Sequence, residues 1–419
     1  MHSSWMTITA IAALAMGNAA SAEEGDATTA GRWSGSVTLR HDIKRVSDLG
    51  PLAMANALQP GLVTTPSDAT TALLELRGQG DGWLLDGALE QSSVAVGDAN
   101  LRGQVRELTW NHDAGPWQFS VGRKIVGWDV GYAFRPNDVV QQETRRTLVS
   151  ATPQGRPLLM AERYGDDSAW SLVWVNPLND ASHRKGDEPA LAVRYYRRVG
   201  ALDWHGFARW AQRTGASVGT AASWVASDAL ELHASLRCLR AADTLRADAP
   251  ASAIVATNPW QPALTDSTAQ ALVGGTWTSA TQFSVLFEAW WDGTAPDGSV
   301  WDAWRQRNAS LAPLAAHGAP AQAVAGNLAW QADAFGASSS MQQRNVYLRL
   351  SWEYEGWQPS VDVLWHPQDG GRMVTTALAW KGDRWQIAGG WRIFGGPEAS
   401  VVAQLPNRHQ AYLQARWTF

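Results

Sequence analysis

Hydrophobic and polar residues alternate along many segments of this chain. In 345–354, "NVYLRLSWEY", every second residue from Val346 to Tyr354 is apolar, and Arg349 and Glu353 fall between them. The segment 230–240, "LELHASLRCLR", alternates in the same way. A period of two residues predicts a β-strand with one apolar face and one polar face.

The alternating segments have the length of strands that cross a membrane. Nineteen can be assigned, from 33–40 to 409–419, and they include 323–335. Most have about 8 to 11 residues, as a tilted strand needs to cross a bilayer, whereas soluble strands most often have about five or six. Bacterial single-chain barrels have an even number of strands. One assignment is therefore expected to be false, and we predict 18 strands, with 16 as the next choice.

Short and long connections separate these segments. The short ones are 112–115, 165–168, 355–358 and 381–383, and the long ones are about 41–68, 124–156, 241–267 and 292–321. Outer-membrane barrels have short periplasmic turns and longer extracellular loops. The pattern predicts an all-β fold, a transmembrane antiparallel β-barrel with short periplasmic turns and long extracellular loops.

Tryptophan is unusually frequent, with 25 residues in 419. Many of these residues stand near the ends of predicted strands: Trp33, Trp83, Trp110, Trp117, Trp170, Trp204, Trp277, Trp291, Trp352, Trp380, Trp385 and Trp391. Indole rings prefer the headgroup region of a bilayer, and membrane barrels carry aromatic girdles at both interfaces. The excess of tryptophan therefore favours a membrane barrel over a soluble sandwich.

The two ends of the chain suggest export and a single domain. Residues 1–22 contain a short apolar core and end in Ala20-Ser21-Ala22, as a signal peptide does. We expect 23–32 to be a short periplasmic segment and 33–419 to form one barrel. No later segment has the roughly 20 consecutive apolar residues of a membrane helix, and the one cysteine, Cys238, excludes an internal disulfide.

Charge and motifs argue against several other functions. The formal net charge of −5 argues against a nucleic-acid partner. The chain lacks a Gly-x-Ser-x-Gly elbow, a His-Glu-x-x-His pair and a P-loop. His233 stands near Glu231 and Ser235 on one strand face, but a histidine in a polar barrel wall explains this arrangement better than a catalytic triad. We assign no catalytic residue, metal or cofactor, and we expect no enzyme activity.

The last strand carries a more specific signal. The chain ends on Phe419, with Trp417 and Leu413 at alternate positions behind it. This strand resembles the C-terminal signal of Gram-negative outer-membrane proteins, which their barrel assembly machinery reads. The resemblance implies a location in the outer membrane of a Gram-negative bacterium, with membrane lipid, lipopolysaccharide and the assembly machinery as partners.

The segment 121–140, "VGRKIVGWDVGYAFRPNDVV", places cations, aromatics and turn residues directly after a predicted strand. A midplane arginine on the lipid face costs about 2–4 kcal/mol, so these cations belong at the rim or inside. The pattern Gly-Arg-Lys-x-x-x-Trp-Asp-x-Gly-Tyr-x-Phe-x-Pro-x-Asp is similar to one in porin-like and alginate-export-like outer-membrane barrels. It indicates a channel rather than any particular substrate.

Two interpretations of this segment stay open. It is either a constriction that contacts solute, since basic side chains give pores an anion preference, or a surface loop paired with acidic residues and lipopolysaccharide phosphates. The candidate constriction residues are Arg123, Lys124, Trp128, Asp129, Tyr132, Phe134, Arg135, Asp138, Arg145 and Arg146.

The predicted inner faces of the strands carry charges of both signs. Candidate lumen-wall residues are Arg194, Arg198, Arg209, Glu231, His233, Arg237, Arg349 and Glu353. A mixed wall suits a hydrated passage and disfavours a strongly basic tunnel for a polyanion. In addition, 299–318 places Trp301, Trp304 and Leu311 at helical spacing. We expect a short helix in a long loop, more as a structural cap than as a gate.

Three functions fit these observations. The first is a diffusion channel for small polar solutes, anionic or aromatic ones among them, narrowed by an inward-folded loop rich in arginine and tryptophan. The second is a dedicated export conduit for a polysaccharide or peptide. The third is a closed barrel with an adhesion, assembly or anchoring role. No self-complementary patch in the sequence fixes an oligomeric state.

Overall fold

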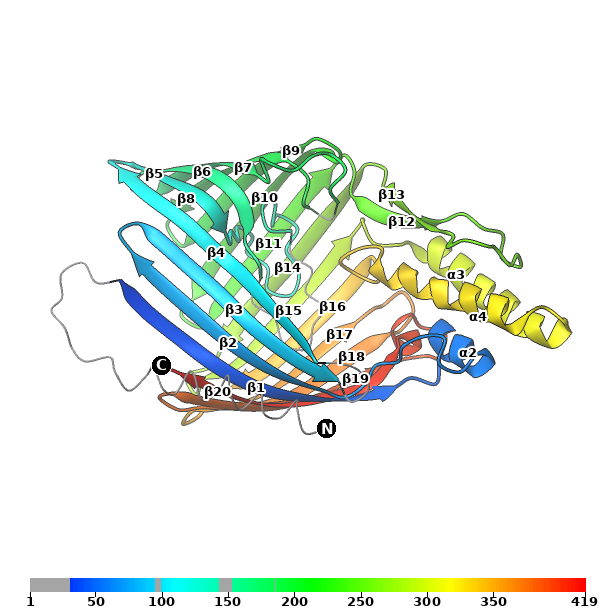
Figure 1. The fold of residues 1–419 in the computed structure, drawn as a ribbon. Coiled ribbons are helices and arrows are strands. Elements are labelled where there is room, and N and C mark those ends of the chain that lie inside the picture. The colour runs from blue at the N-terminus through cyan, green and yellow to red at the C-terminus, as the bar shows by residue number, and fades with distance from the viewer. Residues whose placement is uncertain (1–30, 95–98, 143–152, 185) are drawn as a thin grey trace.

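The computed structural model describes residues 31–94, 99–142, 153–184 and 186–419, and it is a closed antiparallel β-barrel of 18 strands (Figure 1). Each strand pairs with its neighbours along the chain, and β1 pairs with β20 to close the sheet. The strands are β1 (Arg32–Val46), β2 (Ala69–Gly80), β3 (Trp83–Val94), β4 (Asn100–Ala114), β5 (Trp117–Lys124), β6 (Arg156–Tyr164), β7 (Ser168–Val175), β8 (Ala190–Val199), β9 (Leu202–Ala211), β10 (Gly215–Ser227), β11 (Leu230–Leu239), β14 (Thr268–Thr278), β15 (Phe283–Asp292), β16 (Arg344–Trp352), β17 (Trp357–Trp365), β18 (Arg372–Lys381), β19 (Trp385–Gly395) and β20 (Asn407–Thr418). The expected signal peptide, 1–22, lies outside the described residues.

The predicted strand number is confirmed, and the one false assignment is 323–335. This segment forms the helix α4 (Ala321–Trp330) and the 3-10 helix η2 (Gln331–Gly336) instead of a strand. Its buried residues Val324, Ala325 and Leu328 follow helical spacing. The segment is rich in alanine, which has the highest helix propensity, so the apparent alternation was misleading.

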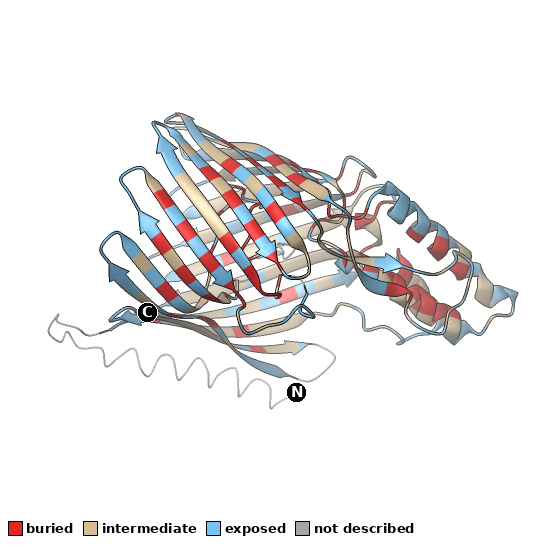
Figure 2. Cartoon of the chain, turned by 90° about the horizontal axis from the view of Figure 1, so that it is seen from above, coloured by how far each residue is buried: buried red, intermediate tan, exposed pale blue. Residues whose placement is uncertain are grey.

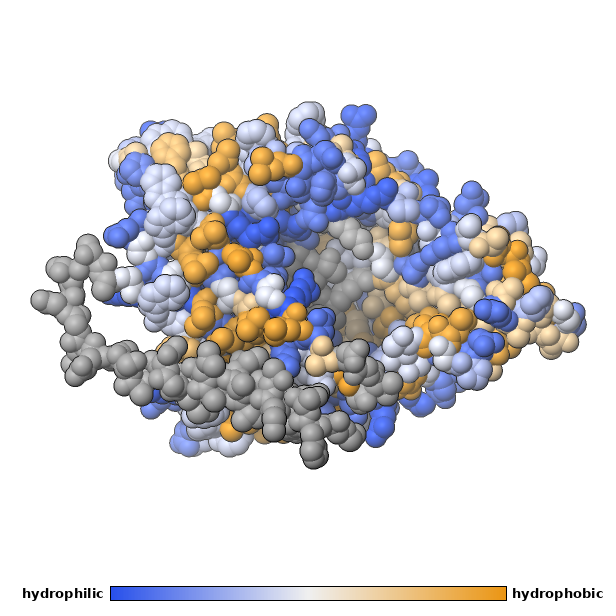
Figure 3. Space-filling view, viewed as in Figure 1, coloured by the Kyte–Doolittle hydropathy of each residue, from blue (hydrophilic) through white to orange (hydrophobic). Residues whose placement is uncertain are grey.

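The two faces of the barrel wall differ as a lipid environment requires. Outward-facing residues such as Leu172, Val218 and Leu413 are exposed, whereas many inward-facing residues such as Ser36, Thr109 and Glu288 are buried and polar (Figure 2). Hydrophobic side chains form patches across the outer face of the strands (Figure 3). This is the reverse of a soluble protein, in which apolar residues are mostly inside.

Exposed tryptophans mark both ends of the strands. At the turn end of the strands lie Trp33, Trp83, Trp110, Trp117, Trp170, Trp204, Trp224, Trp277, Trp352, Trp357 and Trp385, and toward the opposite end, where the long loops leave the barrel, lie Trp174, Trp210, Trp291, Trp365 and Trp391. Both predicted girdles are therefore present among the described residues, and the girdle beside the turns is the denser. Both chain ends of the barrel, at β1 and β20, lie on the side of the turns (Figure 1).

The long loops build a helical lobe that extends past the loop end of the barrel (Figures 1 and 2). The helical lobe consists of α2 (Pro51–Leu58), α3 (Gly298–Leu311), η1 (Ala312–His317), α4, η2 and the hairpin of β12 (Asp243–Ala247) with β13 (Trp260–Leu264). A further 3-10 helix, η3 (Val402–Gln404), lies between β19 and β20. None of the helices in the described part of the chain is long and apolar enough to span a membrane.

The helix expected in 299–318 exists as α3 and η1. Asp297 caps α3 by accepting a hydrogen bond from the backbone N–H of Val300. Trp301 and Trp304 are buried with Trp260 and Val401 in one apolar cluster of the helical lobe. The indole of Trp304 donates to the carbonyl of Gln331 at 2.8 Å. The tryptophans therefore anchor this helix to its neighbours.

Candidate functional site

The segment 125–142, called the inner loop here, leaves β5 and folds into the lumen. It packs against inward-facing residues of β6, β7, β8, β9 and β10, the strands that follow β5, and it also reaches β11, β14 and β15. Its underside is apolar: Val126, Trp128, Val139 and Val140 pack against wall residues that include Phe207. A hydrophobic cluster inside the barrel therefore fixes this loop to one side of the lumen.

Polar contacts hold the middle of the inner loop. The carboxylate of Asp129 accepts a hydrogen bond from the hydroxyl of Ser235 at 2.8 Å. The amide of Asn137 donates to the backbone carbonyls of Thr220 and Leu236. Arg237 donates to the carbonyl of Pro136 at 3.1 Å. Because Ser235 serves Asp129 and not His233, these residues do not form a nucleophilic triad.

The tip of the inner loop is held by a buried carboxylate. Glu288 of β15 is fully buried, and its two oxygens accept from the backbone N–H groups of Tyr132 and Ala133 at 2.6 and 2.7 Å. The ring of His233 lies between Glu288 and Glu231, 3.0 and 3.1 Å from their oxygens. Hydrogen bonds to charged groups are stronger than neutral ones, so this cluster fixes the tip in one position.

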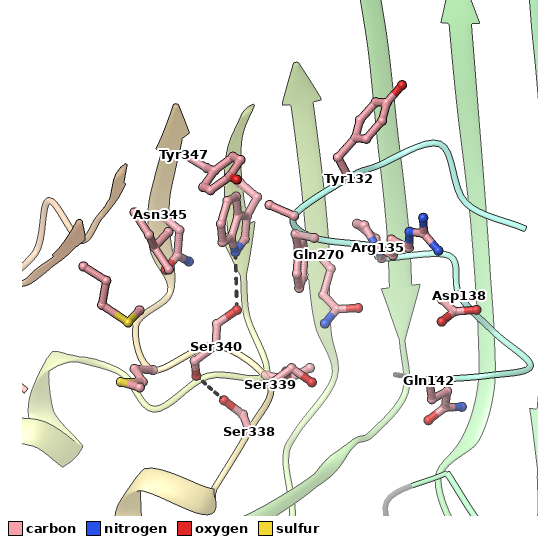
Figure 4. Close-up of a pocket in the computed structure, with 18 of the residues that line it drawn as sticks. Tyr132, Arg135, Asp138, Gln142, Gln270, Ser338, Ser339, Ser340, Asn345 and Tyr347 are labelled. Atoms are coloured by element: carbon pink, nitrogen blue, oxygen red, sulfur yellow. Dashed lines mark hydrogen bonds between the residues drawn. The ribbon is translucent and has the colours of Figure 1, made fainter. Parts of the chain in front are cut away.

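The rest of the lumen contains a cavity of about 1580 Å³ between the inner loop and the opposite wall. Figure 4 shows Tyr132, Arg135 and Asp138 of the loop on one side and Asn345 and Tyr347 on the other. Of the described lining residues, seven are arginines and three are aspartates: Arg40, Arg135, Arg184, Arg209, Arg237, Arg349, Arg392, Asp138, Asp243 and Asp362. The charge around this cavity is therefore predominantly positive.

The arginines differ in how far their donors are already used. Arg237 bonds Ser217 and Pro136, and Arg40 bonds both oxygens of Asp42. Arg349 lies 3.7 Å from Asp362 and is nearly half exposed, while Arg392 donates through Nε to Thr375. Guanidinium groups have five N–H donors. Arg349 and Arg392 therefore keep donors for a solute.

His366, which follows β17, lines the loop end of the same cavity. Its ring lies 2.8 Å from the side-chain oxygen of Asn345, and it is almost completely buried. Burial lowers the pKa of His366 to about 4, against a smaller opposing effect of Asp369. The ring is therefore neutral at neutral pH and adds no positive charge to the cavity.

The predicted constriction residues fall into three groups. Tyr132, Phe134, Arg135 and Asp138 line the cavity. Arg123, Lys124, Trp128 and Asp129 are not among the lining residues: they bond or pack at the rim and the wall, as when Arg123 donates to the carbonyl of Gly155. Arg145 and Arg146 lie outside the described residues.

The predicted lumen residues are also divided. Arg209, Arg237 and Arg349 line the cavity. Arg194 lies over the ring of Trp128 in the inner loop, whereas His233 contacts Glu288, the carboxylate that holds the loop tip, and Glu231 contacts only His233 and Ser223 among the described hydrogen bonds. Arg198 is exposed near the turn end of β8, and Glu353 is exposed in the turn after β16. The expectation that Glu353 lies on the wall is corrected by its place in that turn.

Several residues that line the cavity were not predicted from the sequence. Arg392, Asp362 and Tyr412 face the cavity from β19, β17 and β20. Strand alternation contained the signal, because Arg392 and Phe394 share a face opposite Trp391 and Ile393. The cavity wall opposite the inner loop could therefore have been predicted strand by strand.

Comparison with solved structures agrees with this architecture. The chain is similar to OccK5 (OpdH) of Pseudomonas aeruginosa, with a TM-score of 0.51 and 10% identity over 93% of this chain and 98% of that one. It is also similar to OccAB3 of Acinetobacter baumannii, with a TM-score of 0.50 and 8% identity over 92% of this chain and 99% of that one. The fold is that of a porin-like outer-membrane barrel. No protein-family model and no curated protein sequence matches this porin-like chain.

Proposed function

We propose that this porin-like barrel is a diffusion channel that favours small anions in the outer membrane of a Gram-negative bacterium. Membrane lipid, lipopolysaccharide and the barrel assembly machinery would be its partners. The observation that carries the proposal is the predominance of arginine over aspartate around the cavity. The inner loop narrows the lumen, so solute passes close to these charges.

Electrostatics makes the positive lining effective. A charge acts over about 8 Å at physiological ionic strength, and a narrowed lumen keeps a solute within that distance of the wall. Arg135 reaches the cavity from the inner loop, and Arg349 and Arg392 reach it from β16 and β19. Anions would gain from these contacts during passage, whereas cations would be repelled. Basic linings give pores an anion preference in this way.

The proposal is tested by ion selectivity in planar bilayers. Under a potassium chloride gradient the wild-type barrel should conduct and give a reversal potential that shows chloride preference. Arg349→Gln combined with Arg392→Gln should lower the chloride-to-potassium permeability ratio by about twofold or more, because two charges leave the wall. Arg198→Gln, at the turn end of β8 and outside the cavity lining, is the matched control.

Two outcomes would contradict the proposal. A barrel that inserts but does not conduct would favour the closed-barrel alternative. Conductance without chloride preference, unchanged in the double variant, would remove the arginines from the selectivity mechanism.

A further inference from the structure

The wall opposite the inner loop is organised in rows that the strand register defines. Tyr347 pairs with Leu364, Leu364 with Met373, and Met373 with Phe394, which gives one continuous row across β16 to β19. All four residues line the cavity. We call Tyr347, Leu364, Met373 and Phe394 the apolar row.

A charged row lies directly beside the apolar row. Arg349 pairs with Asp362, Asp362 with Thr375, and Thr375 with Arg392. These residues are two positions further along each strand, toward the turns, and they also line the cavity. Two residues along a strand span about 7 Å. The wall therefore changes from apolar to charged over the length of a small molecule.

Packing of the inner loop explains only half of the apolar row. Tyr347 and Leu364 pack against the cluster of Phe134, Leu272 and Trp290, so they help to seat the loop tip. Met373 and Phe394 continue the row beyond that cluster, and both are only partly buried. The interior of a water-filled barrel is normally polar. An apolar surface at this position would stabilise a solute that itself has an apolar part, because both lose contact with water when they meet.

We propose that the channel selects amphiphilic monoanions: solutes with a short alkyl or ring body joined to one anionic group. This inference rests on the proposed function and names its substrate class. The anionic group would meet Arg349 and Arg392, while the body lies on Met373 and Phe394. Because the charged row is nearer the turns, a solute entering from the loop end moves with its anionic group first.

The test compares two anions of equal carbon number. Hexanoate and gluconate each have six carbons and one carboxylate, but only hexanoate has an apolar body. Reversal potentials of their potassium salts, measured in planar bilayers at about pH 8, report the ions alone, because the neutral acid carries no current. The wild-type channel should prefer hexanoate. Met373→Gln with Phe394→Gln should reduce the hexanoate-to-gluconate permeability ratio about fourfold or more, since apolar contact area is lost.

The control variant changes polarity on the same strand face. Ala377→Ser alters β18 four residues from Met373, also in the cavity lining but outside both rows. It should keep the wild-type ratio. Met373→Gln alone preserves side-chain length and is measured in parallel, so a folding defect of the double variant leaves the test intact. Heat-modifiable migration on gels verifies each barrel.

The outcomes separate this inference from the proposed function. A wild-type channel that prefers chloride over potassium but shows no hexanoate preference would overturn the amphiphile inference and leave the anion channel standing. A hexanoate preference that both Met373→Gln variants retain would also overturn it. Loss of all anion preference in the wild type would remove the proposed function itself. A preference that falls only in the apolar-row variants supports the inference.

Discussion

At the scale of single residues, the width of the channel depends on Glu288. Its carboxylate receives two consecutive backbone N–H groups of the inner loop, and His233 contacts the same carboxylate from β11. The loop itself has little regular structure, so its own backbone bonds do not fix the tip. Glu288 therefore holds the backbone of the loop tip, while the stacking of Phe134 on Trp290 holds its side-chain face.

Glu288→Gln should loosen the tip of the inner loop. A glutamine amide presents one acceptor oxygen and one NH₂ group, so one of the two N–H groups of Tyr132 and Ala133 loses its partner. Losing a hydrogen bond to a charged group costs about 1.5–3 kcal/mol. Single-channel recordings should show larger or noisier current steps than the wild type, because the tip leaves its position for part of the time.

Glu231→Gln is the control for this change. Glu231 contacts the other ring nitrogen of His233 and accepts from Ser223, and its hydrogen bonds among the described residues do not reach the inner loop. The Glu231→Gln substitution, like Glu288→Gln, removes one negative charge that contacts His233. Equal current noise in both variants would show that the loop N–H bonds do not hold the tip.

Sequence reasoning located strand residues better than loop residues. Arg349 was correctly placed on an inward face, because alternation fixes the direction of every second side chain. The inner loop has no such period. Trp128 and Phe134 look equivalent in the sequence, yet Trp128 is buried against the wall and Phe134 stacks on Trp290 at the cavity edge. Only the three-dimensional path of the loop separates them.

At the scale of elements, the strands were predictable and the lobe only in part. Each strand presents one face to the polar lumen and the other to lipid, so polar and apolar residues alternate clearly along it. The assignment of 323–335 as a strand failed because small alanines blur the difference between periods of two and 3.6. The α3 helix was found from Trp301 and Trp304, whose large side chains mark one helix face clearly.

Three loop segments at the mouth are joined around His366 and Asp369. His366 bonds Asn345, while the carboxylate of Asp369 accepts from the side chain of Gln342 and the backbone of Val401. These contacts connect the turn after β17 with the segments that lead to β16 and β20. The neutral ring of His366 is part of this junction.

Acid should weaken this junction. The pKa of His366 is about 4 in the folded protein and has its ordinary value of 6.5 when the junction opens and exposes the ring. As the pH falls, the opened form therefore binds a proton at a higher pH than the closed form. The stabilising contribution is complete above pH 6.5 and is lost as pH falls from 6.5 toward 4, by at most about 1.4 kcal/mol per pH unit. Hydrogen exchange of 338–342, 366–371 and 396–406, corrected for intrinsic rates, should show lower protection at pH 5 than at pH 7.

His366→Gln provides the control, because glutamine does not titrate in this range. The variant should lose the added pH dependence of exchange in these three segments, whatever its absolute protection. If the wild type and the variant lose protection equally between pH 7 and pH 5, another group is responsible.

At the scale of the whole molecule, the barrel wall contacts water on its inner face and lipid on its outer face. Polar residues and the inner loop fill its inside, whereas leucine, valine and tryptophan cover its outside. The single cysteine, Cys238, is exposed on the outer face of β11, next to Leu236 in the strand alternation. Cys238 pairs with Val218 of the neighbouring strand β10. Two residues from Val218, Ala216 pairs with the girdle residue Trp210 of β9. Cys238 should therefore face hydrocarbon just inside the tryptophan girdle.

The native cysteine makes this placement testable without a new label site. In liposomes, a charged maleimide should modify Cys238 at least about tenfold more slowly than in the urea-unfolded chain, because a charged reagent enters hydrocarbon at high cost. A lipophilic pyrene maleimide should react readily in both states. Ser182→Cys in a Cys238→Ser background places the thiol in an exposed loop, where both reagents should react quickly. Fast modification of native Cys238 by the charged reagent would mean that water covers the outer wall, and the membrane barrel would then be the wrong description of this fold.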